Sequence, residues 1–492
     1  MGGKENRNNE TKRVNTIMKV LYIGHYKEFG GWAEAAKNYI LALDSVGIDV
    51  VCRNVTLTSD KEISGRLKEL EDKSAEGCDI CIQHVLPHHL CGSGRFKKNI
   101  AFLASESVSI KHLPWFDFLK QADSLWVPNS CSKKLLEEDN IGIPISVVPH
   151  TFDTSKYKKQ YETINIPEVA NNFVFYYIGD MNDRKNLECA VTCFHSEFDR
   201  SEDTSLVIKI NKFGHAPEEL NKMAAEKIDQ IKSRLRLYSD LSRYKRDVII
   251  PNQVPEEALY GLHQQFHCFL CPSHGEAWSI PSFEAMAFGS TPICSKFGGP
   301  PEFISDDEKT GRCVDGVFSS CKCGDSAFPD LFTGREYWFT PCERQIRQQM
   351  RKYYEAYKEN PIKYTVENKS AGLNQADQFI EAMLAPAPDS RDAGELLMSS
   401  TADGVKRVME GFGKVQKKFS KPITSKQRKE FANKAVDFLQ DSRIGAVFKR
   451  FLLGTLGTKS LADVSLRNGF RDLGLKVHQI IGNQRGAIQK SD

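Results

Sequence analysis

The sequence lacks any long hydrophobic run. No apolar stretch reaches the ~18 residues that a membrane-spanning helix requires, and residues 1–17 are mostly polar, without the apolar core of a secretory signal peptide. We therefore expect a cytoplasmic protein and interpret residues 1–17 as a polar tail. A disordered chain is also excluded, because hydrophobic residues make up 40% of the sequence and charged residues only 27%.

Paired zinc-knuckle cysteines are also missing. All 14 cysteines lie between Cys52 and Cys342, many of them inside apolar runs, so reduced and buried thiols are expected. The cluster of Cys313, Cys321, Cys323 and Cys342 has spacings that match no standard zinc site, although metal binding there stays open. No DxD-like acidic pair follows an expected strand, and we expect neither a catalytic metal nor another cofactor.

Little net charge is present, and it is unevenly distributed. The formal net charge is +3, but residues 385–492 contain 20 Lys+Arg and 11 Asp+Glu, a balance of +9, whereas the remainder has 47 and 53, a balance of −6. APAPDS at 385–390 marks the boundary, and a basic helical extension is expected beyond it. These helices could simply be solvated. They could also make weak contact with a membrane surface or with another anionic partner. No nucleic-acid partner is expected.

What the sequence does contain is a series of short apolar runs that alternate with amphipathic stretches. The runs lie at 19–25, 48–55, 79–85, 99–105, 124–130 and 145–150, and again at 173–180, 205–212, 247–253, 267–273 and 290–296. Continuous apolar strands between helices indicate parallel sheets covered on both faces.

The polar segment 151–172 interrupts this alternation, and we interpret it as a linker. The predicted fold class is α/β, with two facing, doubly wound, Rossmann-like domains at 18–155 and 156–384. Helices near 343–358 and 371–383 should close the second domain. The carboxyl ends of the strands would face a cleft, which is where open α/β sheets bind ligands.

The strongest motif is GEAWSIPSFEAMAFG at 275–289. Glu276 and Glu284 stand eight positions apart, the first on a loop after a strand and the second inside a helix. Pro281 suits the first turn of that helix. A carboxylate at Glu284 could accept hydrogen bonds from the paired hydroxyls of a ribose, and Glu276 could meet a second sugar ring.

Arg184 and Lys185 follow the strand expected at 173–180. Two cations at the carboxyl end of a strand suit a diphosphate, although an ordinary solvated pair is the alternative.

Two Gly-Gly pairs follow other expected strands. Gly298-Gly299 and Gly30-Gly31 would let backbone N–H groups approach an anion near a helix N-terminus, with plain turns as the alternative. Neither pair belongs to a GxGxxG sequence, so a dinucleotide fingerprint is not supported.

Taken in order, these elements resemble glycosyltransferase family 4, whose members are retaining enzymes of the GT-B fold, with two Rossmann-like domains. The E-x7-E of 276–284 is close to that family's signature. Further segments match in kind and order, namely SLWVPNSCSKKLL (124–136), PISVVPHTFD (144–153), GGPPEFI (298–304) and PDLFTGREYW (329–338). The resemblance spans about residues 19–383.

The resemblance implies a metal-independent transfer of a hexose from a nucleotide-diphosphate sugar to a glycan, lipid or protein acceptor. Glu284 would hold the donor ribose, Glu276 the transferred hexose, and Lys185 with Arg184 the diphosphate. Backbone at 298–299 and at Gly31 would approach the phosphates and the sugar.

Two positions depart from the family pattern. Asp180 stands where many members carry an arginine, and Arg184 would have to substitute for it. Glu106 stands where many carry a histidine near the reacting sugar, with His84 and His150 as other candidates that are more often structural. Two alternative functions therefore remain. One is a catalytically inactive binding module, and the other is an epimerase or phosphorylase of the same architecture.

Overall fold

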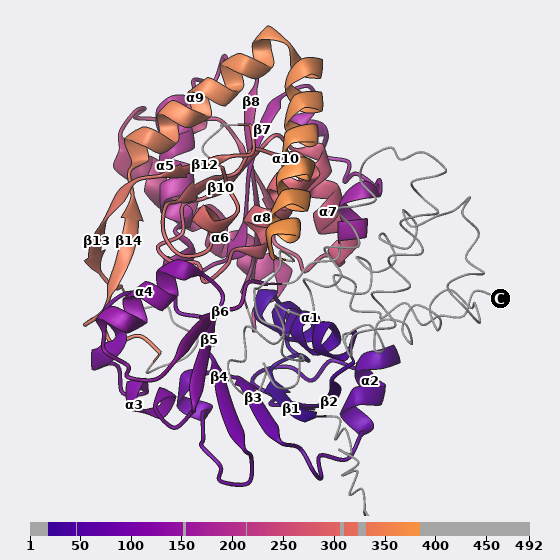
Figure 1. The fold of residues 1–492 in the computed structure, drawn as a ribbon. Helices are drawn as coiled ribbons and strands as arrows, with labels where there is room; N and C mark the ends of the chain where they lie inside the picture. The colour runs from indigo at the N-terminus through magenta and orange to yellow at the C-terminus, as the bar shows by residue number, and fades with distance from the viewer. Residues whose placement is uncertain are drawn as a thin grey trace, which may run out of the picture.

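The computed structural model describes residues 18–45, 47–150, 154–212, 214–305, 309–322 and 331–383. The predicted polar tail at 1–17 and the predicted basic extension at 385–492 lie outside these ranges, and so does Cys323. The described residues form two α/β domains stacked one above the other (Figure 1).

The N-terminal domain is built on a six-stranded parallel sheet in the order β2-β1-β3-β4-β5-β6. Successive residues of β4 serve opposite faces, since Ile100 and Phe102 join the core beneath α1 whereas Ala101 joins the core around α3. The strands are β1 (Lys19–Gly24), β2 (Asp49–Asn54), β3 (Ile80–His84), β4 (Lys98–Phe102), β5 (Ser124–Val127) and β6 (Ile145–Val147). The helices are α1 (Gly31–Ser45), α2 (Gly65–Asp72), α3 (Phe116–Leu119) and α4 (Ser130–Glu138).

The C-terminal domain repeats this architecture with the strand order β12-β11-β10-β7-β8-β9, again all parallel. Its strands are β7 (Phe173–Asp180), β8 (Thr204–Asn211), β9 (Asp247–Ile250), β10 (Cys268–Cys271), β11 (Ile293–Ser295) and β12 (Arg312–Val314). Its helices are α5 (Leu187–Glu197), α6 (Pro217–Leu235), α7 (Glu256–Gln265), α8 (Ile280–Phe288), α9 (Glu343–Glu359) and α10 (Pro361–Met383). The expected doubly wound fold class is confirmed.

The last helix, α10, begins ten residues earlier than expected, at Pro361 instead of near residue 371. Its first turns carry Ile362 and Val366, which are 78% and 62% exposed, so the apolar residues there do not all lie on the buried face of the helix. Farther along, α10 lies beside α8 (Figure 1). The contact is close because Gly372 has no side chain, and a Cβ there would lie 1.9 Å from the carbonyl oxygen of Met286.

The sequence did not predict the antiparallel hairpin of β13 (Gly316–Ser320) and β14 (Tyr337–Pro341). It lies next to α4 of the N-terminal domain (Figure 1). Backbone hydrogen bonds of 3.0 and 3.2 Å join Val108 and Tyr337, and the indole of Trp115 donates to the carbonyl oxygen of Leu331 at 3.3 Å. The hairpin therefore ties the two domains together on one side of their interface.

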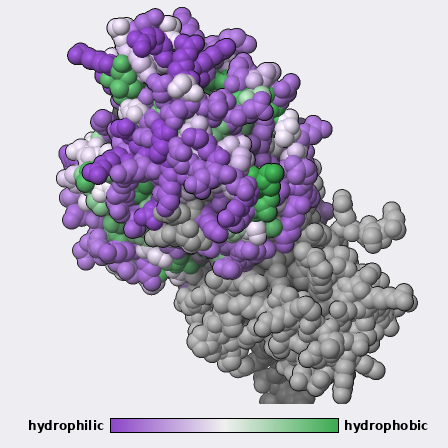
Figure 2. Space-filling view, turned by 90° about the horizontal axis from the view of Figure 1, so that it is seen from above, coloured by the Kyte–Doolittle hydropathy of each residue, from purple (hydrophilic) through white to green (hydrophobic). Residues whose placement is uncertain are grey.

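The end of the molecule seen from above Figure 1 is mainly hydrophilic. Figure 2 shows hydrophobic residues there as separate spots among polar ones, which is the usual appearance of a solvated surface. Within the described ranges, no helix combines the length and the apolar character needed to cross a membrane.

Candidate functional site

The loops that follow the strands of both sheets meet at the domain interface. The amide of Asn129, before α4, donates to the carbonyl oxygen of Ala277 at 2.6 Å. Gly275 lies so close to the N-terminal domain that a Cβ on it would be 1.8 Å from the carbonyl oxygen of Glu106. The loop after β4 and the loop between β10 and α8 are thus in direct contact.

Four charged side chains form a network at this contact. The Nζ of Lys185 lies 2.6 Å from Oε1 of Glu276, and Nη1 of Arg184 lies 3.4 Å from the same oxygen. The Nε of Arg184 lies 2.9 Å from Oε2 of Glu106. Arg184 therefore bridges a carboxylate of each domain, and in this network both cations are paired with carboxylates.

The two carboxylates of the network differ in their protonation behaviour. Burial alone would raise the pKa of Glu276, but the positive charges of Lys185 and Arg184 lower it below its ordinary value. Burial also raises the pKa of Glu106, and Arg184 and Lys185 only partly offset that effect. Glu276 is the more firmly ionised of the two, while Glu106 is the group more ready to hold a proton.

Local hydrogen bonds place the two cations. The side chain of Asn182 accepts from the backbone N–H of Lys185 at 3.0 Å. Asn186 has a left-handed conformation with φ 55°, which asparagine tolerates better than most residues, and its amide donates to the carbonyl oxygen of Pro272 at 3.0 Å. The loop between β7 and α5 is thereby fixed to the loop that carries Glu276.

The Gly298-Gly299 pair packs against the loop that carries Glu276. Gly298 has φ +77°, and a Cβ on it would lie 2.0 Å from the carbonyl oxygen of Glu276. The N–H of Gly299 donates to that same oxygen at 2.9 Å. The glycines hold the backbone of Glu276, so the Gly299 amide is engaged within the protein, and an approach of this backbone to phosphates stays a prediction.

The N-termini of α1 and α8 lie close together at the interface. Gly31, the first residue of α1, is exposed, and a Cβ on it would lie 3.5 Å from Cδ1 of Ile280, the first residue of α8. Gly30 precedes α1 with φ +90°, and Ser279 precedes α8 in a left-handed conformation without a side-chain cap. Because the first N–H groups of a helix have no partner within the helix, two helix N-termini side by side suit an anion.

Glu284 lies in α8, after Pro281, as the motif predicted, and its side chain is buried. Its Oε1 is 2.6 Å from the Nζ of Lys156, and its Oε2 is 3.9 Å from Nε2 of His263. The sequence analysis missed Lys156, because a lysine within the polar linker at 151–172 has no signal that separates it from a solvated one.

Asp180 ends β7 and is exposed, with its carboxylate hydrogen bonded to the amide of Asn211 on β8. The buried Lys209 donates to the side-chain oxygen of Asn211. At the position where many members of the resembled family carry an arginine, this chain therefore has a carboxylate, and it belongs to a small polar network. Arg184 points instead to Glu106 and Glu276, and its substitution for that arginine stays a prediction.

The two histidine candidates are both buried. The ring of His84 lies 4.2 Å from that of Phe102, and its Nδ1 is 2.8 Å from the hydroxyl of Tyr22. His150 stacks on Trp278 of the other domain at 5.5 Å, and burial lowers its pKa to about 3.

Among the described residues, no group of three or more His, Cys, Asp or Glu side chains could hold a metal ion.

Residues 162–319 match the family model of glycosyl transferases group 1. This stretch includes Arg184, Lys185, Glu276, Glu284 and the Gly298-Gly299 pair. No curated protein matches the chain in sequence.

Many solved structures resemble the described fold. An α,α-trehalose-phosphate synthase from Burkholderia xenovorans has a TM-score of 0.51 at 8% identity, over 74% of this chain and 96% of that one. A sucrose-phosphate synthase from Thermosynechococcus elongatus has a TM-score of 0.49 at 14% identity, over 74% and 94%. An Anabaena protein in complex with UDP and glucose has a TM-score of 0.47 at 14% identity, over 73% and 95%. The likeness to the first confirms the expected GT-B fold.

Proposed function

We propose that the protein is a retaining glycosyltransferase that transfers a hexose from a nucleotide-diphosphate sugar to an acceptor. The observation that carries the proposal is one arrangement at the domain interface. The N-termini of α1 and α8 lie close together there, beside the loop on which Glu276 pairs with Lys185 and Arg184. The match of residues 162–319 to glycosyl transferases group 1 supports it.

The chemistry that this arrangement suits is departure of a diphosphate. Negative charge builds on the leaving phosphates as the glycosidic bond breaks, and preorganised cations and helix N-termini stabilise that charge without reorganisation. Lys185, Arg184 and the amides at Gly31 and Ile280 would supply this stabilisation. In a retaining transfer, the acceptor hydroxyl would attack from the same face, and a phosphate oxygen would take its proton.

The remaining side chains would bind the sugars. Glu276 would accept hydrogen bonds from the hydroxyls of the hexose, and Glu284 from those of the ribose. Glu106 approaches the network from the N-terminal domain, which would place it between donor and acceptor. A sugar must share Glu276 with Lys185, so the ion pair would rearrange or widen when the donor binds.

One observation favours a second candidate function, that of a module that binds a nucleotide sugar without catalysing its transfer. Arg184 and Lys185 both form ion pairs with carboxylates in the described structure. If those pairs persisted in the complex, the cations would have less charge to offer a leaving diphosphate.

A thermal-shift screen of nucleotide sugars, followed by a donor-cleavage assay, tests the proposal. A ligand at about 100 times its dissociation constant adds about 2.7 kcal/mol of stability, so donors should raise the Tm measurably, and one donor should be cleaved with or without EDTA. Glu284→Ala should lose the Tm shift while keeping a wild-type circular dichroism spectrum.

Stabilisation without cleavage in the presence of an acceptor panel would favour the binding module. Cleavage that EDTA abolishes and manganese restores would contradict the metal-independent mechanism. No stabilisation by any nucleotide or nucleotide sugar would show the proposed function to be wrong.

A further inference from the structure

Beside Glu284 lies a lysine that is outside the stretch matching glycosyl transferases group 1. Lys156 lies in the short 3₁₀ helix Thr154–Lys158, within the segment that joins the two domains. Its side chain is only 14% exposed, and its ammonium group lies 2.6 Å from Oε1 of Glu284. A buried charge pair of this kind is costly to form and needs good geometry, so its partners indicate what it does.

The hydrogen-bond donors of Lys156 are directed at protein groups. One N–H donates to Glu284 and another to the hydroxyl of Tyr260 at 2.9 Å. The carboxylate of Glu256 lies 4.0 Å from Nζ, and the hydroxyl of Tyr260 donates to that carboxylate. An ammonium group with three N–H donors and these neighbours has little left to offer a phosphate, so a positioning role suits it better than direct contact with a ligand.

The charge of Lys156 favours the ionised state of Glu284. Burial raises the pKa of Glu284 above its ordinary value, and Lys156 is the cation that opposes this effect. The neighbouring carboxylates of Glu256 and Glu34 raise the pKa further. His263 adds no positive charge at neutral pH, since burial lowers its pKa to about 3. The hydroxyl of Tyr176 also lies within the electrostatic reach of Glu284.

We propose that Lys156 is a positioning residue of the donor site, which holds the carboxylate of Glu284 ionised and oriented toward the ribose hydroxyls of the donor. An ionised carboxylate has acceptor oxygens only and can receive both hydroxyls of a ribose, whereas a protonated one presents a donor on one oxygen. This inference rests on the proposed function, because it assigns to Glu284 the binding of a nucleotide.

Lys156 also connects the linker to the donor site. Its carbonyl oxygen accepts from the hydroxyl of Tyr161, and two residues later Lys158 pairs with Asp377 of α10 at 3.6 Å. Lys158 is the matched control, because it belongs to the same 3₁₀ helix and forms an ion pair that does not involve Glu284.

The test is the affinity for UDP, GDP and ADP, measured by titration calorimetry between pH 5.5 and 9 for wild type, Lys156→Met, Lys156→Arg and Lys158→Met. The readout is the ratio of variant to wild-type Kd at each pH, in which titration of the ligand's own phosphates cancels. In Lys156→Met the pKa of Glu284 should rise, so the ratio should grow as pH falls, by about tenfold per pH unit below the new pKa. At high pH, where Glu284 is ionised in both proteins, the ratio should fall to a constant value that reports only the lost orientation of the carboxylate.

Lys156→Arg and Lys158→Met should keep a ratio near one throughout. A Lys156→Met ratio that is constant across pH would overturn the inference, even if it is large, because a purely structural role would weaken binding equally at every pH.

A double variant keeps the test decisive if Lys156→Met does not fold. Glu284→Gln with Lys156→Met removes both charges of the pair, and its Kd should stay within about threefold of that of Glu284→Gln alone, with no loss specific to low pH. A much larger further loss would overturn the inference. If wild type binds none of the three nucleotides at any pH, the proposed function falls and this inference with it.

Discussion

Arg184 and Lys185 are adjacent in the chain, yet they have different partners. Among the described residues, Lys185 forms an ion pair with Glu276 alone, whereas Arg184 pairs with Glu276 and with Glu106 of the other domain. Guanidinium groups can serve two carboxylates through their fixed fork of donors, and an ammonium group acts as a point charge. At the scale of single residues, the two cations should therefore contribute differently to the proposed reaction.

We expect Lys185→Ala to lower the rate of donor cleavage by about 10²–10³, the usual cost of removing one preorganised charge partner of a leaving group. Arg184→Ala should lose rate on a similar scale if Arg184 replaces the arginine missing at Asp180. The double variant should then be non-additive, because both cations act on one group. The measurement is kcat and kcat/KM for donor cleavage.

The control for this series is Lys222→Ala on α6, whose side chain is 79% exposed, and it should cleave the donor at the wild-type rate. If Arg184→Ala is silent while Lys185→Ala is severe, Lys185 acts alone. If both variants are silent, the diphosphate does not bind at this network and the proposed mechanism is wrong in its central step.

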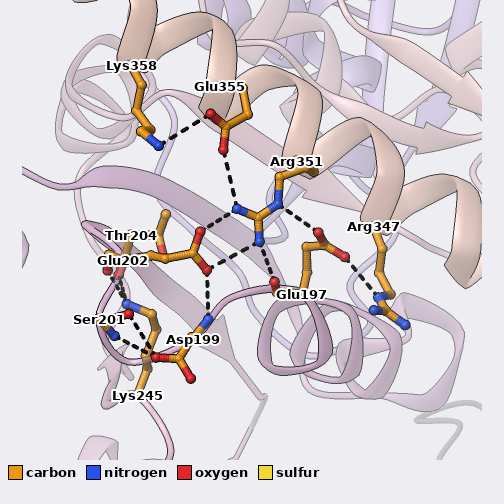
Figure 3. Close-up of polar contacts among 10 residues, drawn as sticks. All are labelled: Glu197, Asp199, Ser201, Glu202, Thr204, Lys245, Arg347, Arg351, Glu355 and Lys358. Carbon is orange, nitrogen blue, oxygen red and sulfur yellow. Dashed lines mark hydrogen bonds and ion pairs between the residues drawn. The ribbon is translucent and has the colours of Figure 1, made fainter.

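At the scale of secondary-structure elements, a charge cluster joins α9 to α5 and to the turn before β8. Figure 3 shows the guanidinium of Arg351 pointing between Glu197 and Glu202. Its Nε lies 2.8 Å from Glu197, and Nη1 pairs with Glu202. The guanidinium also lies 4.5 Å from the ring of Phe198. The cluster fastens a closing helix of the C-terminal domain to its core.

We expect Arg351→Met to lower the free energy of unfolding by about 1–2 kcal/mol, since its bonds are charge-assisted but the side chain is 32% exposed. The matched control is Arg234→Met, which removes an Arg–Glu pair with Glu188 at 3.0 Å whose arginine is 62% exposed. That change should cost less than about 1 kcal/mol. Equal losses in the two variants in urea unfolding would contradict the importance of the cluster.

The pH dependence of this effect follows from Glu202. Burial would raise its pKa, but hydrogen bonds from Arg351 and from the backbone of Asp199 lower it below the ordinary value. A depressed pKa means that the stabilisation is present above the pKa of the unfolded chain and is lost as pH falls through the folded value. The stability difference between wild type and Arg351→Met should therefore shrink when unfolding is measured at acidic pH instead of pH 7.

At the scale of the whole molecule, the two domains share one apolar core. Tyr22 and Tyr39 of the first domain belong to the same buried cluster as Trp278 and Phe283 of the second. The stack of His150 on Trp278 and the hairpin of β13 and β14 add further contacts between the domains. These contacts among the described residues hold together the interface at which we propose that the chemistry occurs.

A chain truncated after residue 388 should therefore keep the donor-cleavage rate of the full chain, because every residue assigned to the site lies between Gly30 and Gly299. If the basic region at 385–492 binds anionic lipid, the full chain should bind acidic vesicles at low salt and release them as salt rises. The truncated chain should not bind them. A truncated chain that folds but no longer cleaves the donor would contradict this separation of roles.

Local sequence patterns were sufficient to predict much of the fold of this protein. Apolar runs predicted β1 to β11, because a parallel strand buried on both faces has to be apolar throughout. The spacing of Glu276 and Glu284 around Pro281 predicted a loop carboxylate and a helical one, and the structure has both. These features depend on neighbours in the chain, so they are visible in the order of residues.

Only the tertiary structure decided which charges meet. Lys156 pairs with Glu284 across 128 positions of sequence, Arg184 reaches Glu106 from the other domain, and Gly298 and Gly299 hold the backbone of Glu276. The sequence shows that each group is charged or small, but not which loops the two sheets bring together. A buried ion pair depends on the position of both partners, and that position is set by the packing of the two domains around their shared core.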